Sequence, residues 1–156
     1  MANSLFQRGL KKECMEIYEE FFSKHAKPTK DIASFYNSAN WVYGQLLMRD
    51  NKFDKAVQRY EYALKLLKGE EWCNLACETA DIYLKLIEQS KEKSKRDAYV
   101  KAVTVIINKL LYQFERPVFF GRGLSMKAHI ELLKGDSEKA AATIEEYKAE
   151  LDNLHA

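Results

Sequence analysis

Glycine and proline are scarce in this sequence of 156 residues, which contains 6 Gly and 2 Pro. Average usage of about 7% and 5% would give roughly 19 residues of the two types together. Because both residues concentrate in turns, their shortage excludes a turn-rich β fold. The chain is instead 47% hydrophobic and 31% charged, with 9 Tyr and 8 Phe. That much apolar surface excludes a disordered chain, and the length predicts a single folded domain over 1–156.

Long apolar runs are also missing. The longest stretches are a few residues, whereas a membrane-spanning helix needs roughly 20. The opening residues MANSLFQRGLKK have no apolar core of a signal peptide,. We therefore expect a soluble cytoplasmic protein with no membrane partner. No Gly-rich phosphate loop or comparable motif occurs, so no cofactor is expected.

Neither net charge nor cysteine content points to a particular partner or metal. The 25 basic and 23 acidic residues leave a formal charge of +2, too small a field to imply nucleic acid or an anionic membrane. Cys73 and Cys77 lie four residues apart on one predicted helix, and the third cysteine makes the number odd, so a disulfide framework is not expected,. A zinc site would need Cys14 or His129 as further ligands, which no spacing brings together, so no metal is expected,.

Apolar residues recur at every third or fourth position almost throughout, which predicts seven helices and no strand. Short connections make successive helices antiparallel neighbours. We expect an N-terminal half-repeat or capping helix over 1–27, with its helix at about 4–24, and three hairpins over 31–69, 71–115 and 118–154. Gly69 and Gly135 are expected to end helices, and Gly121 and Gly123 to loosen the start of the helix that follows Pro117,. The polar run 89–97 is interpreted as an insertion of about ten residues within the second hairpin,.

The clearest internal unit is 37–68. Gly44 is followed twelve residues later by Ala56, four later by Tyr60 and three later by Ala63. This spacing resembles the tetratricopeptide repeat, in which small residues let paired helices approach closely. A second unit repeats the spacing at Ala128, Ala140, Ile144 and Tyr147. The resemblance implies an all-α fold, a right-handed solenoid of helix hairpins; a non-repeat helical bundle is the alternative.

In that family the first helices of successive hairpins line a concave groove that holds a peptide or helix of a partner. The resemblance therefore implies a non-catalytic interaction module or adaptor whose groove residues are Trp41, Gln45, Asn74, Cys77, Asp81, Lys85, Arg122, Ser125 and His129. Trp41 would be the aromatic anchor of this surface, unless it packs against the first helix. Family members that bind acidic chaperone tails hold two carboxylates with paired Lys and Asn. Trp41 and Gln45 stand at the matching positions here, which argues against that role.

Other functions rest on weaker features. The chain is similar in size and architecture to the small cytosolic chaperones of type III secretion translocators, and a homodimer is possible. Lys91–Arg96 is the most basic run and could contact nucleic acid or an acidic protein; the alternative is a solvated loop, favoured because no aromatic residues are interleaved,. Nothing pairs His25, His129 or His155 with a nucleophile, so we expect no enzyme,.

Overall fold

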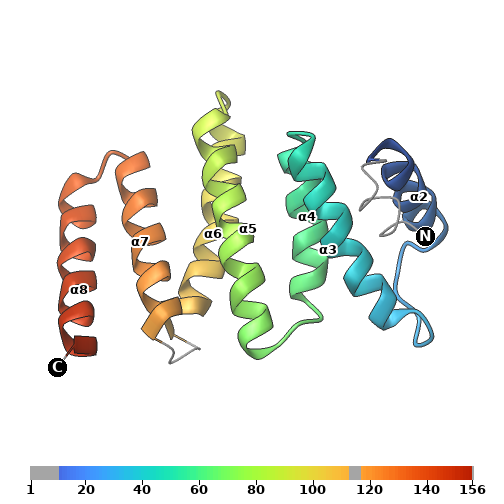
Figure 1. Cartoon of the computed structure of the whole chain (residues 1–156). Coiled ribbons are helices and arrows are strands. Elements are labelled where there is room, and N and C mark those ends of the chain that lie inside the picture. Colours follow the sequence, from blue (N-terminus) through green and yellow to red (C-terminus); the bar gives the residue numbers. More distant parts are fainter. Residues whose placement is uncertain (1–10, 113–116, 156) are drawn as a thin grey trace. The chain divides into compact units, whose positions relative to one another are not determined.

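The computed structural model describes residues 11–112 and 117–155. Within these ranges it contains seven helices and no strand, which confirms the predicted all-α class (Figure 1). The expected start of the first helix near residue 4, and residues 113–115 of the second hairpin, lie outside the described residues. None of the described helices combines the length and the apolar character needed to cross a membrane.

The chain divides into two compact units, 1–66 and 67–156. The first contains α2 (Lys11–Lys24), α3 (Ala33–Arg49) and α4 (Phe53–Leu64), with α3 packed against both neighbours. The second contains α5 (Gly69–Gln89), α6 (Lys93–Tyr112), α7 (Pro117–Leu133) and α8 (Ser137–His155). The single domain and the solenoid stay predictions.

Aromatic rings fill the core of the first unit. Tyr43 on α3 stacks on Tyr18 and Phe22 of α2, with ring centroids 5.9 and 5.5 Å apart. The Arg59 guanidinium of α4 lies 4.2 Å from the centroid of the Phe22 ring, a cation–π contact that ties α4 to the same cluster,. Offset and stacked rings of this kind add to the free energy gained by burying their area. The core therefore joins all three helices.

Close approach of α3 and α4 depends on Gly44. A Cβ at this position would lie 2.6 Å from Cδ1 of Tyr60, which is buried. The glycine therefore makes room for the tyrosine ring. This agrees with the expectation that a small residue at position 44 lets the two helices approach closely.

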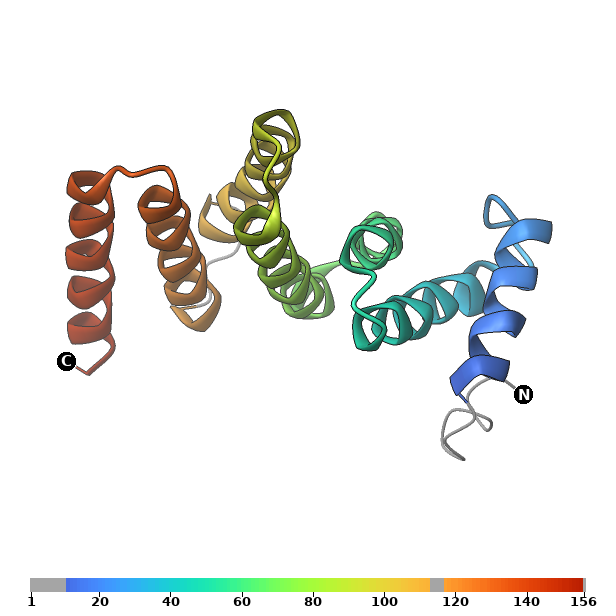
Figure 2. The same ribbon diagram turned by 90° about the horizontal axis from the view of Figure 1, so that it is seen from above.

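The second unit consists of two antiparallel hairpins, α5 with α6 and α7 with α8 (Figures 1 and 2). Both α5 and α6 pack against α7, and α7 also packs against α8. Buried side chains on α5, among them Leu75, Ala80, Ile82 and Ile87, fill the space between these helices. Since α5 is buried on most of its circumference, only a narrow strip of it faces solvent.

Three local predictions are wrong. Gly69 does not end a helix: α4 already ends at Leu64, and Gly69, with φ of 62°, is the first residue of α5. The inserted run 89–97 is mainly helical, because α5 extends to Gln89 and α6 begins at Lys93. Most of Lys91–Arg96 is therefore the first turn of a helix, not a loop, since Lys, Arg and Glu are good helix formers. Gly121 and Gly123 do not loosen a helix start: they lie within α7, where a Cβ would come 2.8 Å from Tyr147 and Leu111 respectively.

Candidate functional site

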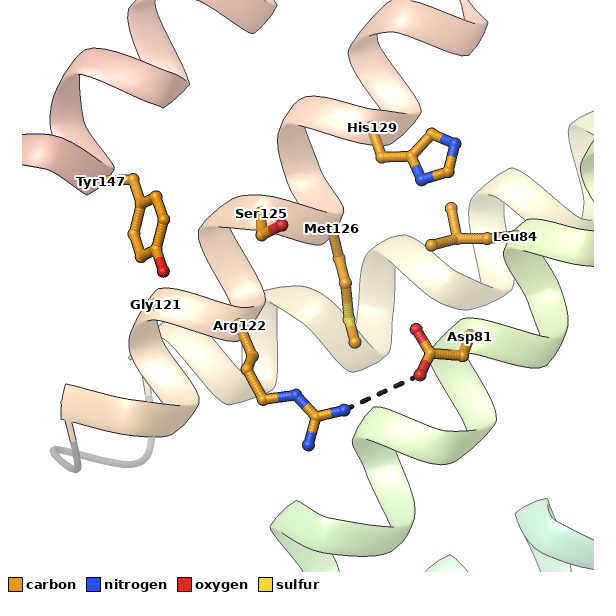
Figure 3. A pocket seen from close by; sticks show the side chains of 8 residues that line it. All are labelled: Asp81, Leu84, Gly121, Arg122, Ser125, Met126, His129 and Tyr147. Atoms are coloured by element: carbon orange, nitrogen blue, oxygen red, sulfur yellow. Dashed lines mark ion pairs between the residues drawn. The ribbon is translucent and has the colours of Figure 1, made fainter.

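Four of the predicted groove residues, Asp81, Arg122, Ser125 and His129, line one pocket of about 280 Å³ in the second unit. Leu84, Gly121, Met126 and Tyr147 complete its lining (Figure 3). We call this the α5–α7 pocket, because all its residues except Tyr147 of α8 come from those two helices.

Helical spacing brings these side chains together. Arg122, Ser125 and His129 follow at intervals of three and four residues, so they lie in a row on one face of α7,. Asp81 on α5 faces that row (Figure 3). Tyr147 reaches the pocket because Gly121 has no side chain: a Cβ there would lie 2.8 Å from the tyrosine ring. The pocket therefore depends on a small residue of α7 as well as on polar ones.

Two polar contacts join α5 to α7 at this surface, the Arg122–Asp81 ion pair and a hydrogen bond between His129 and Glu88. Arg122 Nη2 lies 3.7 Å from Asp81 Oδ2, and His129 Nε2 lies 2.9 Å from Glu88 Oε1. All four side chains are roughly half exposed, and ion pairs of this kind contribute about 0–1 kcal/mol. The distance between Arg122 and Asp81 exceeds that of a hydrogen bond, so these two side chains attract each other only through their charges,. A ligand could therefore displace the pair at small cost.

Burial and charge act in opposite directions on Asp81. Burial raises the pKa of its carboxyl, while the cations of Arg122, Lys85 and His129 act to lower it. One turn before Asp81 on α5, burial raises the pKa of the Cys77 thiol to about 11. Cys77 is fully buried and does not line the pocket. A protonated, inaccessible thiol has neither the charge nor the access for chemistry.

The other predicted groove residues lie elsewhere. Asn74 and Lys85 are exposed on α5 but do not line the pocket. Trp41 and Gln45 are on α3 in the first unit, where Trp41 is 45% exposed and therefore outside the aromatic core.

Sequence reasoning missed Leu84, Met126, Tyr147 and Glu88, the partner of His129. Glu88 follows Asp81 by seven residues, so helical spacing on α5 could have revealed it,. Tyr147 could not be found in this way, because its place depends on how α8 packs against α7.

The described residues show no metal-binding cluster: nowhere in 11–112 or 117–155 do three or more His, Cys, Asp or Glu side chains gather closely enough to hold an ion. Cys73 and Cys77 are both buried, and neither forms a disulfide.

No protein-family model matches the chain, and no curated protein matches it. The resemblance to the tetratricopeptide repeat therefore depends on residue spacing alone.

Proposed function

We propose that this protein is a non-catalytic interaction module that binds a peptide or helix of a partner protein at the α5–α7 pocket. The observation that carries the proposal is the convergence of Asp81, Arg122, Ser125 and His129 on one cavity. A tetratricopeptide groove would bring the same four residues together.

The chemistry of the pocket suits a peptide. Buried Leu84 and Met126 supply an apolar floor, and the flexible thioether of methionine adapts to differently shaped side chains,. Around this floor, the Arg122 guanidinium can donate to a carboxylate or carbonyl, and the Asp81 carboxylate can accept from an N–H group. An apolar cavity with a few convergent polar groups is the usual form of a ligand site.

Trp41 supplies a second element of the proposal. Tryptophan is enriched among the residues that dominate protein interfaces, and 45% of this side chain is exposed. We propose that it serves as an aromatic anchor for a partner, as the family resemblance implies.

Selection of peptides from a random display library on the full chain would test the pocket, followed by anisotropy titration of the selected peptides. Ser125→Tyr should block the cavity, because Ser125 is exposed and the added ring would occupy the space above Met126. We expect a loss of affinity of about ten-fold or more, the scale of a central contact.

Asn108→Tyr is the matched control. Asn108 is exposed on α6 in the same unit but outside the pocket, so the same ring added there should leave affinity unchanged. Selected peptides that bind Ser125→Tyr as tightly as the native chain would contradict the proposal, and so would a selection that yields no binding peptide.

A further inference from the structure

The second unit contains another cavity, of about 380 Å³, where α5 ends, α6 begins and α7 ends. Its floor is aliphatic, formed by Ile87, Val100 and Leu133. We call it the α6 pocket. It shares no lining residue with the α5–α7 pocket.

Positive charge surrounds this floor. Lys93 and Arg96 of α6 and Lys134, just after α7, line the pocket, with the Asp97 carboxylate as the single acidic group of the lining. Among the described residues, none of the three cations has a carboxylate within ion-pair distance. Lys134 does act on the nearby Asp136, whose pKa it helps to lower, although the Lys139 backbone N–H is the main cause.

Lys93 and Arg96 carry like charges and lie in the first turn of α6, where the helix dipole does not favour cations,. The first turn of α6 contains no acidic residue, although the helix dipole favours negative charge at this end. Glu92, just before the helix, pairs with Lys95, 3.4 Å away, so Asp97 is the one carboxylate that lines the pocket with the three cations. Like charges held close together repel one another in the unliganded state. Binding of an anion among them relieves this repulsion and is therefore favourable.

The floor distinguishes between anionic partners. Single-stranded nucleic acid binds through cations combined with aromatic rings on which bases stack, and the lining of the α6 pocket contains no aromatic residue. An aliphatic cavity between cations instead suits an apolar side chain that has carboxylates on either side of it in sequence.

We infer that the α6 pocket binds an acidic peptide segment of a partner protein. An apolar side chain of the segment packs against Ile87, Val100 and Leu133, while flanking carboxylates pair with Lys93, Arg96 and Lys134. The site adds a charge-selective contact to the interaction module proposed above and does not depend on it, because the two pockets have no residue in common.

The test is fluorescence anisotropy of the full chain with a labelled peptide of sequence EDLEDL. Peptide EDSEDS, which keeps the charge but lacks the apolar side chains, and a short oligothymidylate serve as comparison probes. We expect EDLEDL to bind more tightly than either, and its affinity to fall as salt is added.

The decisive variants are Lys93→Glu and Arg96→Glu, each expected to weaken EDLEDL binding about ten-fold or more. Both place a carboxylate in the first turn of α6, where the dipole favours it, so loss of binding cannot be attributed to a weakened helix. Lys101→Glu, with the same charge change on the same helix outside the pocket, is the matched control and should keep near-native affinity.

Equal losses in Lys101→Glu and Arg96→Glu would overturn the inference, because binding would then follow net charge alone. Equal affinity for EDLEDL and EDSEDS would exclude the aliphatic floor as a contact. Tighter binding of oligothymidylate, lost in the same variants, would identify a nucleic-acid site instead. Each result leaves the Ser125→Tyr test of the α5–α7 pocket unaffected, so the two proposals can fail separately.

Discussion

Replacing Gly44 by alanine tests the packing on which the resemblance to a helical repeat depends. The new methyl group would lie 2.6 Å from Cδ1 of Tyr60, well inside van der Waals distance. Tyr60 is 3% exposed, so its ring has little room to move away. Alanine therefore forces either the ring or the two helices apart.

The magnitude follows from two opposing effects. Overpacking a core costs about 1–3 kcal/mol, and the close contact with a buried ring places this site at the upper end. Replacing a glycine by alanine in a helix interior stabilises the helix by about 1 kcal/mol. We therefore expect Gly44→Ala to lower the free energy of unfolding of the first unit by about 2 kcal/mol.

Urea denaturation followed by tryptophan fluorescence measures this change. Of the two tryptophans, Trp41 is on α3 and Trp72 on α5, so Trp72→Phe in every variant leaves a signal from the first unit alone. Ser38→Ala, an exposed position on the same helix, is the control and should be neutral or slightly stabilising,.

A second substitution checks the cause. In a Tyr60→Leu background the ring is gone, so Gly44→Ala should show only the helix-propensity gain of about 1 kcal/mol. The reasoning is refuted if Gly44→Ala is as stable as the native chain while Tyr60 is present, or equally destabilising in both backgrounds.

Three further predictions concern turns and titrating groups. Gly135→Ala should lower the free energy of unfolding by about 1–2 kcal/mol, and Asn51→Gly should raise it by up to about 1 kcal/mol, because both positions have positive φ,; thermal melts followed by circular dichroism would show the opposite shifts. Because Cys77 is buried and its pKa is about 11, a thiol-specific disulfide reagent at about pH 8 should modify it only after urea is added,. Peptide mapping that finds Cys77 labelled in the folded chain would contradict this. Burial also raises the pKa of Tyr18 and Tyr43, so the folded state holds these protons more tightly than the unfolded state. Stability should be unaffected below about pH 9 and fall as pH rises through the tyrosine range, as urea midpoints in a pH series would measure.

Sequence reasoning was most successful where local physics decides. The apolar period is a property of a few consecutive turns, so it predicted the helical class, and Gly135 predicted the end of α7. Gly135 shows this well: it adopts φ of 81°, and the carboxylate of the next residue, Asp136, accepts a hydrogen bond from the backbone N–H of Lys139 in the first turn of α8,. A glycine followed by a capping residue can be recognised in a sequence without any tertiary information.

The predictions that are wrong concern residues whose role depends on contacts between two helices. The sequence predicts a local role for Gly121 and Gly123, but the structure shows that they make room for Tyr147 of α8 and Leu111 of α6. For the same reason, helical spacing could place Arg122, Ser125 and His129 on one face of α7, but could not show that Tyr147 lines the pocket or that Cys77 does not.

The turns after α3 and α7 bear on whether the chain is a repeat or an unrelated bundle. Lys52 N–H donates to the carbonyl of Leu47 at 2.9 Å, and Asp136 N–H donates to that of Glu131 at 2.9 Å. Each bond encloses a residue of positive φ, Asn51 and Gly135, so both turns have the same Schellman geometry.

Each member of the second turn lies 84 residues beyond its counterpart in the first, because 135 is 84 residues beyond 51. The same offset separates Gly44 from Ala128 and Ala56 from Ala140, the small residues that carry the family spacing. A turn is stabilised by its own backbone bonds, whereas small residues are required by contacts between helices, so these two agreements have different physical causes. An unrelated bundle has no reason to place both at one offset. Their coincidence supports the prediction from residue spacing that α3 with α4 and α7 with α8 form two similar units.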